Sequence, residues 1–322
     1  MAQAEGIQSQ IFIQEEATYG SDPTPGGYLL PIVSEDVRTT EKLIESKLIR
    51  SSRNPSRPGR GNQSVDGNIV TELIAELGYF WKWALGSVTD SGSGPYTHIF
   101  KIDNTLASFV LEKGFTDISQ YFKFNGCKLG GFSLDVDSEG ISQITFPVMG
   151  QKETVGSSPL DSTPVEYDPT IFDSFDIGTI EEGGASIAIV TSIRGLTFDN
   201  ALSGDNYVIN PSALGIRTGI GTDIAKVKGT ITASFENVTL YNKAVNGTES
   251  SLKLIWSKGD GLGSAGNESL EFFIPELRYE RATPIIPGAV PLIVELGFVG
   301  YYENHADASA LEITLKNATA SY

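Results

Sequence analysis

The sequence carries one pattern twice, in widely separated places. The stretch DGNIVTELIAELGYFWKWALG begins at Asp66, and the stretch KGTITASFENVTLYNKAVNG begins at Lys228. Aligned without a gap, the two stretches match at Gly67 and Gly229, Ile69 and Ile231, Leu73 and Phe235, and Tyr79 and Tyr241. A repeat of this kind predicts that one structural unit occurs twice in the chain.

Two further matches follow in the same order. SFVLEKG at Ser108 resembles SLEFFIPE at Ser269, and ITFPVMG at Ile144 resembles VELGFVG at Val294. A chain of 322 residues is long enough for two such units. We therefore predict a tandem duplication.

The periodicity of the apolar residues favours a mainly β fold. Many short runs are strand-rich, and GFSLDVDSEGISQITF is typical of a hairpin closed by DSEG. From Ile69 the apolar residues recur three or four apart, which predicts a helix that ends at Gly86. A second short helix is predicted to end at Gly247. Each unit is then expected to be an antiparallel β-sandwich with one flanking α-helix.

The distribution of charge suggests four segments. No base occurs between Lys152 and Arg194, while acids accumulate there, which is typical of a solvated linker. The predicted segments are an N-terminal arm with the first strand (1–34), a first unit (35–152), an acidic linker (153–183) and a second unit (184–322).

The composition restricts the function. The net charge is −17, and both halves carry more acids than bases, which argues against tight binding of DNA or RNA. With one cysteine, Cys127, the chain cannot form an internal disulfide. We recognise neither a signal peptide nor an apolar run long enough to span a membrane, so we expect synthesis in a reducing cytoplasm without membrane insertion.

The sequence contains no catalytic motif. His98 and His305 lack a second histidine at ligand spacing, and the context of Cys127 does not predict a reactive thiol. The acids of DVDSEG, from Asp135, fit a hairpin turn better than a calcium loop. We predict no enzyme activity, metal or cofactor. A carboxylate-dependent hydrolase is the least favoured alternative function.

Two features are candidates for contacts between subunits. A Pro/Gly-containing loop carries the bases Arg50, Arg53, Arg57 and Arg60, which could meet carboxylates of another copy. Trp81 continues the apolar stripe of the predicted helix, whereas Trp83 is expected to face a partner subunit. A solvated loop tip and a core tryptophan are the alternatives.

The combined pattern resembles the major tail tube proteins of long-tailed, siphovirus-like bacteriophages. The resemblance rests on the repeated Gly-x-Ile strand and helix and on SLEFFIPELRYERATPIIPGAV. Two N-terminal stretches add to it, EEATYGSDPTPGGYLLPIVSEDV and SRNPSRPGRGNQSVDGNIVTELIAELGYFWKWALG. It covers most of the chain and includes no catalytic signature.

The resemblance implies a structural virion protein that forms stacked rings around an acidic lumen. The lumen conducts DNA in transit and first holds the tape-measure protein. Two units per chain favour three chains in a pseudo-sixfold ring, with a hexamer as the alternative. The arm 1–34, the arginine loop 50–61 and the loop 201–226 are expected to stack rings. The residues do not indicate which acids face the lumen.

The implied partners are other copies of the chain, the tape-measure protein, the tail tip and the tail terminator. The implied location is the phage tail, after synthesis in the cytoplasm of the host bacterium. A neck or terminator ring, or a prophage-derived secretion or contractile tube, would share the fold.

Overall fold

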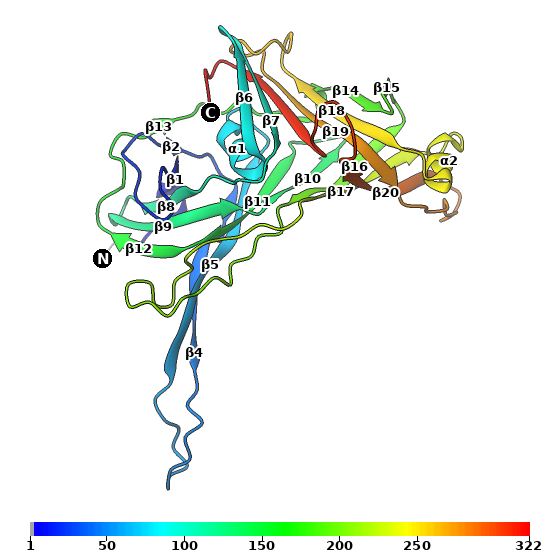
Figure 1. The fold of residues 1–322 in the computed structure, drawn as a ribbon. Coiled ribbons are helices and arrows are strands. Elements are labelled where there is room, and N and C mark those ends of the chain that lie inside the picture. The colour runs from blue at the N-terminus through cyan, green and yellow to red at the C-terminus, as the bar shows by residue number, and fades with distance from the viewer. Residues whose placement is uncertain (1–2) are drawn as a thin grey trace.

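The computed structural model describes residues 3–322 and is mainly β (Figure 1). A long sheet crosses the whole molecule and joins its two halves. Its strands pair in the order β4 (Arg38–Ile44), β5 (Gly59–Glu72), β11 (Gln143–Gly150), β10 (Gly131–Asp137), β16 (Val190–Asp199), β17 (Lys226–Ser234) and β20 (Ile293–Tyr301). The short β3 (Ser34–Glu35) also pairs with β5.

Two outer sheets cover the long sheet, one for each half. The first runs β13 (Val165–Glu166), β2 (Tyr28–Leu29), β1 (Ser9–Glu15), β8 (Phe109–Phe115), β9 (Gln120–Leu129), β12 (Lys152–Gly156). The second runs β15 (Ala185–Ser186), β14 (Ile177–Glu182), β18 (Ser250–Ser257), β19 (Ser269–Tyr279), β21 (Glu312–Asn317), β7 (Tyr96–Ile102), β6 (Gly86–Gly92). Because β6 and β7 come from the first half, the two halves are interlocked. Short 3-10 helices occur at Gly6–Gln8 and Ser174–Asp176.

The helix α1 (Gly78–Leu85) begins later than predicted. Residues 69–72 belong to β5, where alternate side chains such as Val65 and Ile69 are buried and the strand pairs with β11. The helical spacing read from Ile69 was therefore wrong, because its first residues follow the period of a strand. The end of the helix is confirmed, since Gly86 caps it in the left-handed conformation at φ 104°.

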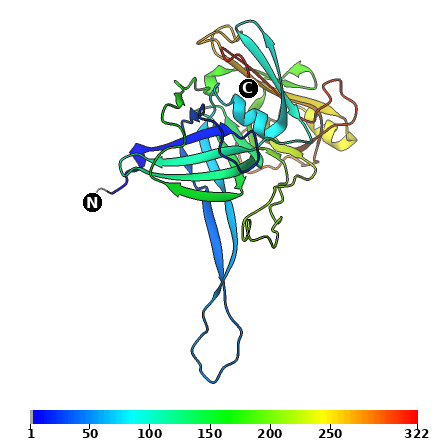
Figure 2. The same cartoon turned by 60° about the vertical axis from the view of Figure 1, so that its left-hand side comes forward.

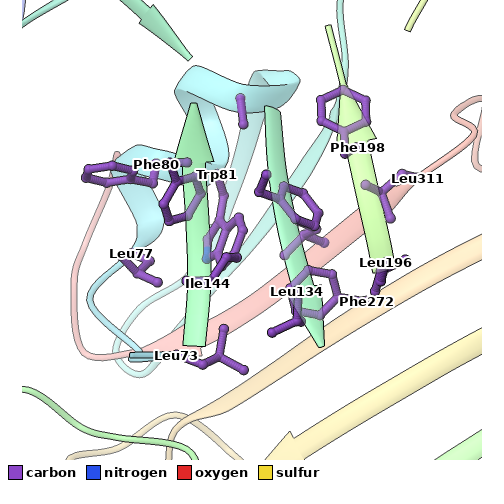
Figure 3. Close-up of a cluster of buried hydrophobic side chains, with 14 of the residues drawn as sticks. Leu73, Leu77, Phe80, Trp81, Leu134, Ile144, Leu196, Phe198, Phe272 and Leu311 are labelled. Atoms are coloured by element: carbon purple, nitrogen blue, oxygen red, sulfur yellow. The ribbon is translucent and has the colours of Figure 1, made fainter. Parts of the chain in front are cut away.

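The two helices occupy different environments. In α1 most side chains are buried, so this helix lies in the core and does not merely flank a sandwich (Figure 3). The helix α2 (Thr239–Asn246) ends at Gly247 as predicted, but Leu240 is its one buried residue. α2 therefore adds little to the core.

The buried aromatic residues around α1 come from both halves of the chain. The ring of Trp81 packs against Phe132 and Phe146 of the first half and against Phe272 of β19, with centroids 5.4–5.6 Å apart. One continuous hydrophobic cluster includes residues from both halves. The halves therefore share a core.

The predicted acidic linker, 153–183, is built largely into the fold. Its first residues form most of β12, and Phe172 is completely buried. The segment TIFDSFDIG leads into β14, which pairs with β18 near the edge of the second outer sheet. The segment 153–183 therefore connects the two halves as a folded, packed segment.

The hairpin β8–β9 in the first half contains a bulge. Phe109 faces Cys127, and Leu111 faces Phe124. The two residues along β8 are thus matched by three along β9, so β9 carries the extra residue. β9 then contacts β11 where Leu129 lies opposite Val148.

The hairpin β18–β19 in the second half contains the same bulge. Ser250 faces Leu277, and Leu252 then faces Ile274. β19 likewise continues to β20. In its bulge and its further pairing β19 resembles β9 and not β8, so the match drawn between Ser108 and Ser269 does not agree with the strand pairing.

The glycines Gly67 and Gly229 do occupy corresponding places. Gly67 lies opposite Val148 of β11, and Gly229 lies opposite Phe298 of β20. A Cβ on Gly67 would come within 2.4 Å of the Cα of Val37, and one on Gly229 within 2.7 Å of the Phe298 ring. A glycine is needed at both places because a neighbouring residue approaches the strand closely.

Candidate assembly surfaces

The long sheet has one buried face and one solvent-facing face. In β11, for example, Ile144 and Phe146 point into the core, while Gln143 and Thr145 point to solvent. Over the body of the sheet, the ionisable residues on the solvent-facing side are the acids Asp66, Glu72, Asp135, Asp137, Asp199 and Glu295 and the bases Arg38, Arg194, Lys226 and Lys228. Acids outnumber bases on this face, which we call the polar face.

The carboxylates of DVDSEG take part in this surface as structural groups. Asp135 accepts a hydrogen bond from the backbone N–H of Gly195 at 2.6 Å, and Asp137 forms an ion pair with Arg194 at 2.6 Å. The predicted hairpin is confirmed by the pairing of β10 with β11. These acids therefore tie β10 to β16.

The two ends of the long sheet differ from its interior. Among the described residues, β4 pairs with β5 alone. At the other end β20 pairs with β17 along residues 293–300, whereas β19 covers only residues 298–301 of its other side. Both ends therefore leave backbone N–H and C=O groups without a strand partner.

The arginine loop is the tip of a hairpin formed by β4 and β5 that projects far from the body (Figure 2). Arg60 forms a two-pronged ion pair with Glu41 of the facing strand, at 2.6 and 2.8 Å. The guanidinium of Arg50 donates to backbone carbonyls within the loop. In the described structure Arg53 and Arg57 are exposed and make no ion pair, so they are the bases available to a partner.

The loop 201–226, which links β16 to β17 as the projecting hairpin links β4 to β5, lies against the first half. Tyr207 donates to the backbone carbonyl of Gln63 at 2.8 Å, and the N–H of Gln63 donates to Gly215 at 2.7 Å. The loop therefore covers the base of β5.

Arg217 anchors that loop and is 5% exposed. Its guanidinium donates to the carbonyls of Gly204, Val65 and Gly150 at 2.9–3.0 Å, and to the carboxylate of Asp66 at 3.0 Å. Sequence reasoning missed this residue, because its partners are distant in the chain.

Trp83 does not present a surface to a partner. It is 1% exposed, stacks on Phe109 with a centroid distance of 4.5 Å, and donates from Nε1 to Glu15 at 2.8 Å. The predicted subunit contact is therefore wrong, because α1 is enclosed on the side where Trp83 points.

The N-terminal segment is not an extended arm. β1 pairs with β8 over its whole length, and Ile11, Phe12 and Ile13 are buried. Glu16 then accepts hydrogen bonds from the N–H groups of Gly20 and Gly126. The strands β1 and β2 of this segment therefore belong to the first outer sheet, and residues 1–2 lie outside the described part.

His98 is buried instead of lying at the surface. Its ring nitrogens contact Asp90 at 2.6 Å and Asn317 at 3.1 Å. In the described part of the chain no group of three or more His, Cys, Asp and Glu side chains could hold a metal ion. This histidine is accounted for by structural contacts.

Burial raises the pKa of the Cys127 thiol, and nearby Glu16 adds to the effect. Because the thiolate is the reactive form, we expect native protein to resist labelling by a water-soluble disulfide reagent and denatured protein to react fully. Absorbance of the released thiolate measures both states. Rapid labelling of the native protein would contradict the burial of this side chain.

No helix of residues 3–322 has the length and apolar character needed to cross a membrane. The curated proteins contain no significant match to the chain. Residues 6–300 match the family described as phage tail tube protein. The match extends over most of the chain, and we conclude that the chain belongs to the phage tail tube protein family.

Proposed function

We propose that the chain is the major tail tube subunit and assembles into stacked rings around a channel for DNA. The observation that carries this proposal is the long sheet, which has one polar face and an incomplete pairing at each end. Exposed sheet edges pair readily with other strands, and closing the sheet into a barrel removes them. Joining copies edge to edge would place the polar face around a lumen.

The repeated geometry supports three chains per ring over six. The two hairpins share a bulge at the same position, and two glycines occupy corresponding places in the long sheet. We infer that the chain is a tandem duplication, so each chain supplies two units. Three chains then supply six units in a pseudo-sixfold ring.

The polar face is suited to passage of DNA without binding. Phosphates are held by clusters of Lys and Arg, and each such contact strengthens binding. On this face acids outnumber bases, and Arg194 is paired with Asp137. A wall of this kind repels the phosphate backbone weakly and lets the duplex slide.

The projecting hairpin is the candidate contact between stacked rings. Because Arg53 and Arg57 lie at its tip without an ion pair, they can meet acids of the next ring. Replacing both with Glu should abolish or strongly shorten tubes, because attraction would become repulsion between acidic surfaces. Electron microscopy of tube length measures the effect.

The matched control is Arg60→Gln, which removes a base from the same hairpin but breaks an ion pair within the chain. We expect tubes of ordinary length from this variant, because an exposed ion pair contributes about 0–1 kcal/mol. Normal tubes from Arg53→Glu/Arg57→Glu would show that the loop is merely solvated.

The same assignment places the protein in the phage tail. Its partners would be the tape-measure protein within the lumen, the tail tip as the nucleus and the tail terminator at the far end. A neck or terminator ring would share the fold but would not polymerise.

End-on views of purified, concentrated protein by negative-stain electron microscopy test the proposal. We expect hollow tubes with three chains per ring. Six chains per ring would retain the function and reject the pseudo-sixfold arrangement. Protein that never assembles, even with the tail tip as nucleus, would favour a non-polymerising ring component.

A further inference from the structure

The first half of the chain has a strand that the second half lacks. After the N–H of Gly130 donates to Pro147 at 2.8 Å, the chain continues as β10. One edge of β10 pairs with β11, where Leu134 lies opposite Ile144. The other edge pairs with β16, where Leu134 lies opposite Leu196. β10 is therefore the strand through which the long sheet joins the two halves.

The second half starts in the same way and then departs from it. The N–H of Glu280 donates to the carbonyl of Gly297 at 2.7 Å, the counterpart of the bond from Gly130 to Pro147. Residues 281–292 then form no strand, although this stretch has the same length as residues 131–142. In the described structure, the side of β20 that would receive a strand at residues 293–296 has no strand partner.

Residues 281–292, which form no strand, are largely apolar and exposed. Ile285 and Ile286 are 74% and 81% exposed, and Val290 is also exposed. The first-half counterpart of Ile286 is Val136, which is 3% exposed within β10. Removing apolar side chains of this size from water is favourable. The stretch therefore gains if a partner covers it.

The opposite end of the long sheet offers a matching partner. A Cβ on Gly67 would lie 2.4 Å from the Cα of Val37, and a Cβ on Gly229 would lie 3.3 Å from the Cα of Leu196. The segment of β3 and β4 therefore corresponds to β16. Whereas the edge of β16 is covered by β10, the edge of β4 is not covered in the described structure. Each copy thus lacks a strand beside β20 at one end of the long sheet and has an unpaired edge on β4 at the other end.

We infer that residues 281–286 become the missing strand during assembly and pair with residues 34–40 of the next copy. The partner is a second copy of this chain, because the pairing of β10 with β16 already provides the same junction within one chain. In the junction within one chain, Ser133 lies opposite Thr197 and Leu134 lies opposite Leu196. The same register between copies places Thr283 opposite Arg38 of the next copy and Pro284 opposite its Val37. This inference rests on the proposed function and specifies its subunit contact.

The composition of the stretch explains why it stays unformed in one chain. Pro284 and Pro287 have no N–H to donate, so the ladder has fewer bonds than that of β10 with β16. Val37 and Thr39 are also smaller than their counterparts Leu196 and Phe198. The junction between chains is therefore weaker than the junction within a chain, which protects the free subunit from indiscriminate pairing.

A disulfide between copies tests the register. Residues directly opposite in neighbouring strands come close enough for a disulfide, which needs a Cα separation of about 4.4–6.8 Å. The test variant is Thr283→Cys/Arg38→Cys, whose sites face each other in the inferred junction. The control is Thr283→Cys/Ser34→Cys, which moves one thiol four residues along the strand, roughly 13 Å. Buried Cys127 does not compete.

Both variants are assembled, oxidised and separated on a non-reducing denaturing gel. We expect most chains of the test variant to run as linked dimers and closed trimers, and the control to run as single chains. Tubes of the test variant without cross-links, or preferential cross-linking of the control, would overturn the register and leave the tube proposal standing. Wild-type protein that forms no rings would overturn the proposed function.

Hydrogen exchange of the wild-type protein provides a second test that needs no substitution. Amides of residues 281–286 other than that of Pro284 should exchange freely in the single chain and at least about tenfold more slowly in tubes, because strand pairing protects them. If the cysteine variants fail to assemble, this measurement decides. Unchanged exchange in well-formed tubes would overturn the inference.

Discussion

Trp81→Ala is expected to lower the free energy of unfolding by about 3–5 kcal/mol, the cost typical of removing a large aromatic side chain from a core. Trp81 is completely buried and contacts aromatic rings from both halves of the chain (Figure 3). The resulting cavity would lie where the halves meet, so both should lose stability together. The shift of the urea midpoint, followed by far-ultraviolet circular dichroism, measures the loss.

Two variants control for this effect. Phe175→Ala removes a ring that is 90% exposed and should change the free energy by less than about 0.5 kcal/mol. Trp81→Phe should cost less than Trp81→Ala, because it retains a ring and removes an indole N–H that has no hydrogen-bond partner in the described structure. Equal losses from Trp81→Ala and Phe175→Ala would contradict the shared core.

Arg217→Ala is expected to cost about 2–4 kcal/mol, because buried acceptors left without donors cost about 1–3 kcal/mol each and some regain water. The guanidinium satisfies three backbone carbonyls, including those of Val65 and Gly150, and pairs with Asp66. Loss of this anchor should release the loop 201–226 from β5. Limited proteolysis of the loop and the urea midpoint measure the two effects.

Arg217→Lys is the informative comparison. Lysine keeps the charge but cannot donate to carbonyls in several directions from one planar group. We expect it to lose most of the stabilisation, which a purely electrostatic role would not predict. Arg194→Ala, which removes a half-exposed base paired with Asp137, should cost no more than about 1 kcal/mol. A loop that stays resistant to protease in Arg217→Ala would contradict the anchoring role.

Local signals in the sequence were sufficient for several elements. The turn at DSEG and the ends of both helices were predicted correctly because glycine and turn residues act on the backbone beside them. The alignment of Gly67 with Gly229 also agrees with the structure, since a close approach excludes a side chain at both places. The mainly β fold and the tail tube family followed from the same patterns.

Distant contacts changed other interpretations. The helical spacing alone places Trp83 off the apolar stripe, on a face expected to be exposed. In the structure Phe109 of β8 and Glu15 enclose its side chain. The N-terminal segment has little periodicity, yet β1 is buried because it pairs with β8. The acidic stretch after Lys152 reads as a linker, although its pairing with β9 and β18 packs it into the fold.

The amino-acid sequence by itself determined the strand-rich class, the glycine-capped helices and the matching segments, because these depend on residues close together in the chain. The tertiary structure alone decided which strands became neighbours, that β6 and β7 complete the sheet of the other half, and that Arg217 meets Asp66. Those outcomes depend on contacts between residues far apart in the chain. Their strength comes from packing and burial, which no single stretch of the sequence encodes.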